Sequence, residues 1–479
     1  MRKITFWTDR LHRYFGISLA IPMLAWCLSG VVMMYVGYPS LPEEIRLGHL
    51  SSLSWAGCCV IGEPSLSDDT PVRQIQVEML AGHPVLRISP VSGPSRLIDI
   101  TDGHLVDGIG SGWARDVAAA YGPVAEIWSL TDDQWTVADD FASDRPLFHV
   151  ILSGQEGAEL YVSSSNGKAV QFTTRWQRFW NWLGAIPHWV YFTSIRRNVS
   201  LWAEIVIWTS LAGGFLTAIG IYIGIRQFRR RPPGRWSAHR GVMLWHHVPG
   251  LIFGLFTFTW VMSGFLSMNP WGTLEGVSAD PARARVQGRV LTGGEVKRAV
   301  RDLAGVHLDP DVVSIASAPL DGSFYLIATS RDGRRWRLDA TGQPASPPDI
   351  ARIATLLGTS NGGNGLELID REDAYYFGHH GELAPLPVYR LILDDRGIRY
   401  YIDPLSGDIV RKVDANGRWY RWLEQAPHRL DFATGLRARP TWDLVALLLL
   451  GGVALSCGTG CYLSVRWVWR KVVKMSGRR

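Results

Sequence analysis

Four long apolar runs constrain the fold of this chain more than any other feature of its sequence. The runs are Phe15–Tyr35, Leu201–Ile225, Val248–Met268 and Trp442–Val465. Each is about as long as the 20 residues that an α-helix needs to cross the hydrocarbon core of a bilayer. Buried helices of soluble proteins are seldom so long and so apolar, and we therefore predict a membrane protein with four spanning helices.

The basic residues gather at one end of each predicted span. They are Arg2, Lys3, Arg10 and Arg13, then Arg226, Arg229, Arg230, Arg231, Arg235 and Arg240, and finally Arg466, Arg470, Lys471, Lys474, Arg478 and Arg479. The positive-inside rule predicts that both termini and the short loop are cytoplasmic, with the segments of roughly 40–200 and 269–440 outside. The net charge of +6 is therefore a sign of topology and not of nucleic-acid binding.

Two sets of residues recur in identical spacing along the chain. The first set is His12, Gly16, Trp26, Ser29 and Gly30, repeated as His246, Gly250, Trp260, Ser263 and Gly264. The second set is Trp182, Leu183, Pro187, His188, Phe192 and Trp202, repeated as Trp422, Leu423, Pro427, His428, Phe432 and Trp442. So many matches in one register predict an internal duplication. Because each half contains two spans, the halves are expected to be parallel repeats about an axis along the membrane normal.

The duplication and the spans predict the domain organisation. The expected parts are an N-terminus with the first spanning helix (1–38), a first external α+β unit (39–175), a Pro-His segment with the second spanning helix (176–226), a basic loop (227–240), the third spanning helix (241–268), a second external α+β unit (269–417), and a Pro-His segment with the fourth spanning helix and a basic tail (418–479). Short alternating runs such as Leu147–Leu152 and Glu159–Ser163, separated by turn residues, predict antiparallel sheet in the external units.

Four duplicated histidines carry the predicted chemistry. His12 and His246 lie at the cytoplasmic ends of the first and third spans, whereas His188 and His428 lie just before the outer ends of the second and fourth. The repeat axis would bring the members of each pair to equal depth and opposite each other. Two facing imidazoles suit the axial positions of a haem iron, and we therefore predict two haem b groups. The alternatives are that each histidine is an interfacial polar residue, or that the set conducts a metal ion.

Two further histidines complicate the inner site. His247 follows His246 directly, and His239 precedes it by seven residues. Either could replace His246 as the ligand or contact a haem propionate, but only His246 is selected by the repeat. Glycines near the histidines were expected to let a flat macrocycle approach the helices. They are Gly16, Gly30, Gly220, Gly250, Gly264 and Gly460.

Several motifs together resemble the PepSY-associated transmembrane family. They are the His-Arg-x-x-Gly opening at His12–Gly16, the His-His-x-Pro-Gly-Leu segment at His246–Leu251, the two Pro-His segments, and the external motifs Leu97–Gly103 and Tyr401–Gly407. The resemblance extends over nearly the whole chain. It implies PepSY-like periplasmic domains, a place in the bacterial inner membrane, and a relation to haem-binding ferric-siderophore reductases. Electrons would come from the cytoplasmic side, through an external donor such as a quinol or a separate reductase.

The remaining expectations concern the substrate and rival functions. Six aromatic residues and histidines of the external segments are candidates for contact with a ferric siderophore: Trp128, Trp135, Tyr375, Tyr376, His379 and His380. No catalytic residue is predicted beyond the haem ligands. One alternative function is a non-catalytic PepSY membrane protein that binds or regulates a periplasmic partner. A small-solute permease is a third, which the few helices and large external segments disfavour.

Overall fold

The computed structural model describes residues 2–55, 58–154, 157–359, 365–378, 384–393 and 397–476. The chain divides into two compact units, each built from separate stretches of sequence. The first, here called the helical unit, comprises Met1–Tyr38, Trp176–Gly276 and Ala415–Arg479. The second, here called the sheet unit, comprises Pro39–Arg175 and Val277–Asp414.

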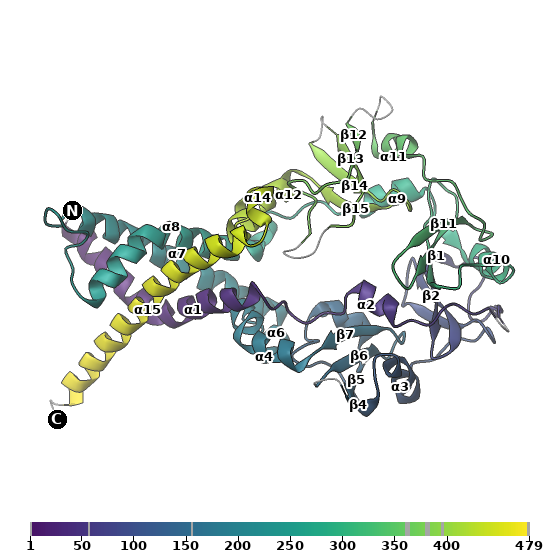
Figure 1. Ribbon diagram of the computed structural model, residues 1–479, viewed down its shortest axis with the longest axis horizontal. Coiled ribbons are helices and arrows are strands. Elements are labelled where there is room, and N and C mark those ends of the chain that lie inside the picture. The colour runs from purple at the N-terminus through teal and green to yellow at the C-terminus, as the bar shows by residue number, and fades with distance from the viewer. Residues whose placement is uncertain are drawn as a thin grey trace. The chain divides into compact units, whose positions relative to one another are not determined.

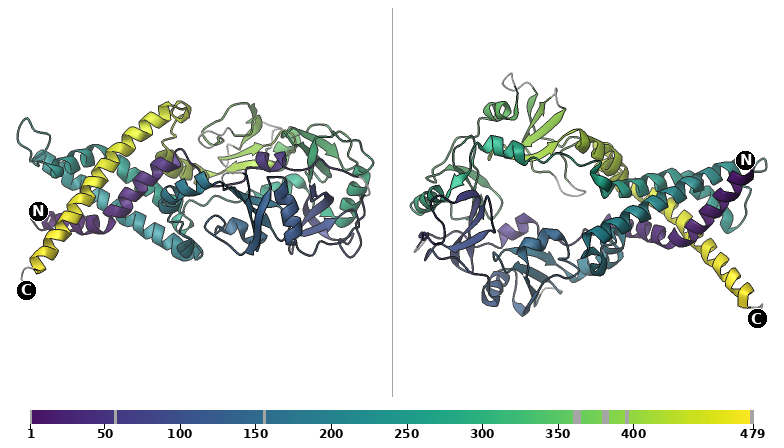
Figure 2. Two further views of the ribbon diagram at one scale, coloured as in Figure 1. Left: turned by 60° about the horizontal axis from the view of Figure 1, so that its bottom comes forward. Right: turned by 180° about the vertical axis from the view of Figure 1, so that it is seen from behind.

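Four long helices form the framework of the helical unit (Figure 1). They are α1 (Arg2–Met33), α7 (Val199–Arg229), α8 (Val242–Ser267) and α15 (Thr441–Ser476). Both α1 and α8 pack against α7 and against α15, and the four helices cross one another as a bundle (Figure 2). Among the described residues, these four helices are long and apolar enough to cross a membrane, which confirms the prediction of four candidate spans. Apolar side chains such as Ile21 and Leu448, each 70% exposed, suit contact with lipid.

Short helices precede α7 and α15 in the same manner. Before α7 lie α4 (Arg175–Leu183), α5 (Ala185–Trp189) and α6 (Thr193–Arg196); before α15 lie α12 (Ala415–Tyr420), a π-helical turn (Arg421–Gln425), α13 (Ala426–Arg429) and α14 (Thr434–Arg437). Val190 and Leu430 end α5 and α13 in the same left-handed conformation, with φ 55° and ψ 39°. The indole of Trp202 donates to the carbonyl oxygen of Trp189, as that of Trp442 does to Arg429. Both Pro-His segments are thus held against the start of the following long helix.

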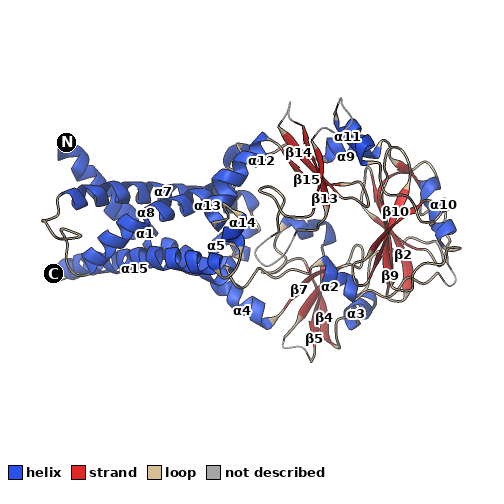
Figure 3. Ribbon diagram, turned by 45° about the horizontal axis from the view of Figure 1, so that its top comes forward, coloured by secondary structure: helices blue, strands red, loops and turns tan. Residues whose placement is uncertain are grey.

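A seven-stranded sheet, to which both segments of the sheet unit contribute, is here called the central sheet (Figure 3). Its strands are β1 (Pro71–Leu80), β2 (His83–Pro90), β3 (Arg96–Asp99), β8 (Leu291–Thr292), β9 (Val312–Ser317), β10 (Tyr325–Ser330) and β11 (Arg335–Asp339). The order β11-β10-β9-β1-β2-β3 reads as two three-stranded meanders joined through antiparallel β1 and β9, with Val77 opposite Ile315. The sequence predicted one α+β unit in each external segment, whereas the two segments share this sheet.

Each segment also forms a four-stranded antiparallel sheet of its own. The first contains β4 (Val124–Leu130), β5 (Leu147–Leu152), β6 (Glu159–Ser163) and β7 (Ala169–Thr173); the second contains β12 (Leu366–Ile369), β13 (Val388–Leu393), β14 (Ile398–Ile402) and β15 (Ile409–Val413). Strands β5 and β6 have the bounds predicted from the sequence, because each is a short, mostly apolar run that ends at turn residues.

Helices cover these sheets and close their cores. They are α2 (Glu43–Gly48), α3 (Ser111–Ala119), α9 (Asp280–Gln287), α10 (Gly293–Leu303) and α11 (Ile350–Leu357), with a 3₁₀ turn at Asp139–Asp144. A further 3₁₀ turn, Pro270–Gly272, follows α8 in the helical unit. The core of the central sheet includes Val300 and Leu303 of α10, whose first turn is fixed by a capping box between Thr292 and Glu295. The chain therefore combines four candidate spanning helices with antiparallel sheet, which confirms the coarse fold class.

Candidate functional site

His12 of α1 is held by the neighbouring helix α7. Its Nδ1 lies 3.3 Å from the carbonyl oxygen of Leu216. A carbonyl oxygen only accepts hydrogen bonds, so Nδ1 carries the proton and the lone pair of the neutral ring is on Nε2. The ring packs directly against Gly220, where an added Cβ would lie 2.8 Å from Cε1 of His12. Only glycine leaves room for the imidazole at this point of α7.

His246 of α8 is held in the same way by α15. Its Nδ1 lies 3.0 Å from the carbonyl oxygen of Ser456, and a Cβ at Gly460 would lie 3.2 Å from its Cε1. Ser456 and Gly460 follow Leu216 and Gly220 by 240 positions each. The two histidines therefore have equivalent supports, and each presents Nε2 as the nitrogen that is able to bind a metal.

The rings of His12 and His246 face each other across the bundle. Their centroids are 6.3 Å apart, and the ring planes are inclined by 39°. With metal–nitrogen bonds of about 2 Å and each nitrogen roughly 1 Å from its own ring centroid, two imidazoles on opposite sides of one metal ion have centroids about 6 Å apart. The observed separation is therefore compatible with two imidazoles that bind one metal ion from opposite sides.

A second facing pair is formed by His188 of α5 and His428 of α13. Their ring centroids are 6.1 Å apart. Nδ1 of His188 lies 3.0 Å from the hydroxyl oxygen of Ser29, and Nδ1 of His428 lies 2.9 Å from that of Ser263. Each hydroxyl donates its own hydrogen to a helix carbonyl oxygen, at Trp26 or Trp260, so it accepts from the imidazole. Nε2 is again left as the metal-binding nitrogen.

The glycines have a contact that the sequence did not predict. Gly220 and Gly460 adjoin the imidazoles of His12 and His246, and their expected role in the approach of a flat macrocycle stays a prediction. Gly30 and Gly264 adjoin the outer histidines, where an added Cβ would be 3.5 Å and 3.7 Å from the ring carbons. These distances are ordinary contacts, so the inner pair is the more tightly confined.

His247 and His239 are separated from the facing pair by their own contacts. The buried ring of His247 accepts a hydrogen bond at Nδ1 from Ser237 (2.7 Å) and donates from Nε2 to the carbonyl oxygen of Gly224 (2.9 Å). Both of its nitrogens are therefore engaged within the protein. His239 lies beside His247, with ring centroids 5.6 Å apart, and its backbone amide donates to Ser237. The geometry favours His246 over either neighbour as the ligand.

The donor set fits a haem better than a bare metal ion. No group of three or more His, Cys, Asp or Glu side chains that could hold a metal ion is found among the residues that the structure describes. A haem iron needs only two protein ligands, because the porphyrin supplies the other four. Gly30, which adjoins His188, follows His12 by 18 residues on α1, or about 27 Å at 1.5 Å per residue. The two pairs thus lie near opposite ends of the bundle.

No protein-family model matches the chain, and no curated protein is similar to it. The assignment of the site therefore depends on the geometry of these side chains.

The aromatic residues predicted to contact a substrate do not form one cluster. Trp128 of β4 is 41% exposed and lies against His149. Trp135 and Tyr376 are buried, 6% exposed each, in different parts of the sheet unit. Backbone amides of Trp135 and Tyr375 donate to Asp133 and Asp373, respectively, so these segments serve local turns. The remaining candidates, His379 and His380, lie outside the described residues.

The sequence did not reveal the groups that orient the histidines. Ser29 and Ser263 belong to the first repeated set, so the repeat could have indicated that these two serines have equivalent roles. The acceptors on α7 and α15 are backbone carbonyl groups, which every residue type supplies. No side-chain pattern could have identified them.

Proposed function

We propose that this chain is an internally duplicated, PepSY-associated protein of the bacterial inner membrane that binds two haem b groups and reduces ferric siderophores in the periplasm. The observation that carries the proposal is the presence of two facing histidine pairs, 6.3 Å and 6.1 Å between centroids, in which every Nε2 is left to a metal. His12 and His246 would hold one haem, and His188 and His428 the other.

The equivalence of supports in the two halves favours the duplication. Leu216 and Ser456 accept from the inner histidines, and Ser29 and Ser263 accept from the outer ones. The strand order of the central sheet, with one meander from each half, is also what two copies of one unit would produce. Such agreement at helices, turns and strands is difficult to attribute to chance spacing.

Strand pairing supports the proposed topology. Strands β1 and β9 belong to one sheet, so their segments must lie on the same side of a membrane. Two candidate spans, α7 and α8, separate them in the chain. An even number of crossings returns the chain to the side from which it left. The basic loop between α7 and α8 would then be cytoplasmic, as the positive-inside rule requires.

The protein's own residues would keep each pair ready for a metal. Hydrogen bonds from Nδ1 to helix carbonyl and serine oxygens fix the tautomer and the ring orientation, as is usual for metal-binding histidines. When bound, a haem with two histidine ligands supplies one-electron transfer without a change of ligands. Two such sites would divide a bilayer core of about 30 Å into shorter transfers. Reduction of Fe(III) to Fe(II) weakens its binding to hard oxygen chelators and so releases the iron.

The visible spectrum of the detergent-purified chain tests this function. We expect a Soret band, a reduced-minus-oxidised α-band, and reoxidation of the dithionite-reduced protein by a ferric siderophore. Colourless protein from haem-replete cells would falsify the proposal. The alternative hypothesis, that the chain binds or regulates a periplasmic partner, would then be favoured.

A further inference from the structure

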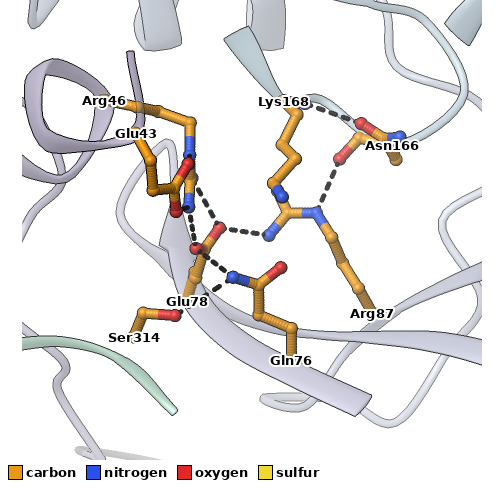
Figure 4. Close-up of polar contacts among 8 residues, drawn as sticks. All are labelled: Glu43, Arg46, Gln76, Glu78, Arg87, Asn166, Lys168 and Ser314. Atoms are coloured by element: carbon orange, nitrogen blue, oxygen red, sulfur yellow. Dashed lines mark hydrogen bonds and ion pairs between the residues drawn. The ribbon is translucent and has the colours of Figure 1, made fainter. Parts of the chain in front are cut away.

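A charged cavity lies within the sheet unit, apart from the histidine pairs. Its volume is about 230 Å³, and α2, β1, β2, the end of α3 and the turn before β7 contribute to its walls. Four charged side chains of the lining lie close together: Arg46, Glu78, Arg87 and Lys168 (Figure 4). We call this space the Lys168 cavity.

Glu78 is the centre of the charged cluster. Its carboxylate, which is fully buried, accepts hydrogen bonds from Arg46 at 2.7 Å and 3.1 Å, and from Arg87 at 2.7 Å. Gln76 adds a fourth at 2.8 Å. Arg46 also binds Glu43 through two N–H groups. Burial alone would raise the pKa of Glu78, but the guanidinium groups of Arg87 and Arg46 outweigh it and hold that pKa below its ordinary value.

The cations are not fully used by the protein. Arg87 donates two hydrogen bonds in the described structure, to Glu78 and to the carbonyl oxygen of Asn166, out of the five N–H groups that a guanidinium has. The ammonium of Lys168 makes no hydrogen bond or ion pair with any described residue. Its backbone groups are bound: the amide donates to the side chain of Asn166, and the carbonyl oxygen accepts from the amide of Ser163. Figure 4 shows the charged ends of Lys168 and Arg87 directed toward each other at the cavity.

The balance of charge favours an anion. The cluster contains three cations, Arg46, Arg87 and Lys168. It contains two carboxylates, Glu43 and Glu78, so its net charge is +1. A third carboxylate, Asp116, lines the cavity but is exposed to solvent. Burial and the charge of Arg46 lower the pKa of Lys168, so a negative ligand would relieve an unfavourable arrangement.

The fold itself does not require this cluster. In the antiparallel β1–β9 ladder Gln76 lies opposite Ala316, Val77 opposite Ile315, and Glu78 opposite Ser314. A two-fold axis through the Val77–Ile315 pair would exchange the two strands. Ala316 would then occupy in the second half the place of Glu78 in the first. Asp408 follows Gly407 after β14, as Lys168 follows Gly167 after β6. The second half thus forms the same strands with an alanine and an acidic residue at these places. The cluster is therefore a feature of the first half alone.

We propose that the Lys168 cavity binds a small oxyanion, a carboxylate or a phosphate, held by the ammonium of Lys168 and the unused N–H groups of Arg87. Both groups form strong charge-assisted hydrogen bonds with such oxygens. Tyr121 and His49, whose rings stack with centroids 4.1 Å apart, also line the cavity and could pack against the organic part of a carboxylate. The site does not depend on haem.

Calorimetric titration of the detergent-solubilised full chain with succinate and with inorganic phosphate tests the proposal, with potassium chloride at equal ionic strength as the reference. We expect saturable binding of at least one oxyanion. Lys168→Met, which removes the charge and does not touch Glu78, should weaken that binding at least about tenfold, whereas Lys168→Arg should retain it. Lys412→Met is the matched control, because the Lys412 ammonium already donates to the carbonyl oxygens of Val277 and Ser278.

The two oxyanions distinguish the source of the ligand. Binding of succinate alone indicates an organic carboxylate, and binding of phosphate alone indicates a phosphate; both support the site. Heat signals no larger than those of chloride, or equal affinity in Lys168→Met and the unmodified chain, overturn it. The haem spectrum is recorded on the same samples, so a failure here is separable from a failure of the proposed reductase.

Discussion

Nδ1 of His246 lies 3.0 Å from the carbonyl oxygen of Ser456, whereas both ring nitrogens of its neighbour His247 are bound within the protein. Adjacent histidines of one helix point in different directions, since each residue turns by about 100° about the axis. His247 therefore makes contacts within the protein, whereas His246 has Nε2 available for a ligand. Substitution of each histidine tests this difference.

His246→Ala should remove one of two haem signals, and His12→Ala should remove the same one. The reason is that both rings would bind one iron, so loss of either leaves it without a full axial pair. The measurement is haem content per chain together with the reduced-minus-oxidised spectrum, and we expect about half of the unmodified amount. His239→Ala serves as the control and should keep both signals. Retention of both haems in His246→Ala would contradict the ligand assignment.

Ser263→Ala should weaken the outer site without abolishing it. The hydroxyl of Ser263 is the acceptor for Nδ1 of His428 at 2.9 Å, and loss of such a partner usually lowers metal affinity about 10–100-fold. Faster transfer of haem to an acceptor such as apomyoglobin would report the change. Ser267→Ala removes a serine on the same helix that bonds only to the Gly264 carbonyl oxygen, and it should transfer haem at the unmodified rate.

Gly220→Ala and Gly30→Ala should have opposite effects. At Gly220 the new methyl would be 2.8 Å from the ring of His12 and must displace it, whereas at Gly30 it would be 3.5 Å from His188. Alanine in a helix interior is favoured over glycine by about 1 kcal/mol, so Gly30→Ala should be neutral or stabilising. Haem content and melting temperature of the two variants check this. Equal loss of haem in both would show that confinement of His12 is not what matters.

Acid should destabilise the sheet unit through Glu78. Its folded-state pKa is lowered from the ordinary 4.5, so its contribution to stability is present above that value and is lost as the pH falls through the folded-state pKa. Glu78→Gln should cost about 3–5 kcal/mol at neutral pH, because Arg87 then remains buried without a carboxylate partner, whereas Arg46 keeps Glu43. Melting temperatures by circular dichroism between pH 3 and 7 should fall toward acid in the unmodified chain and change less in the variant. A parallel pH dependence of the two proteins would remove Glu78 from this role.

The sequence predicted the features that depend on local pattern. Hydrophobic length identified α1, α7, α8 and α15, and short apolar runs between turn residues identified β5 and β6, because both signals are complete within one element. The repeat also selected His246 in place of His247. That choice remains a prediction, although the engaged nitrogens of His247 favour it.

The features that depend on distant partners were not predicted. The pairing of β1 with β9 joins residues such as Val77 and Ile315, and no periodicity in either strand specifies the other. The sequence analysis did not single out Glu78, because Arg46 and Lys168 reach its surroundings from separate segments of the chain. The contacts of Gly220 and Gly460 with imidazoles were not predicted for a similar reason, since they depend on which helix each imidazole contacts.

The β1–β9 ladder also sets the order in which the protein can be assembled. Ile315 is made 238 residues after Val77, a delay of about 10–50 s at 5–20 residues per second. During this time β1 presents an unpaired edge, which is a template for aggregation. Both α7 and α8 lie between β1 and β9 in the chain, so they are made before β9. The first half therefore needs its exposed strand edge to be protected, by a chaperone or by a temporary pairing, until the second half has been delivered.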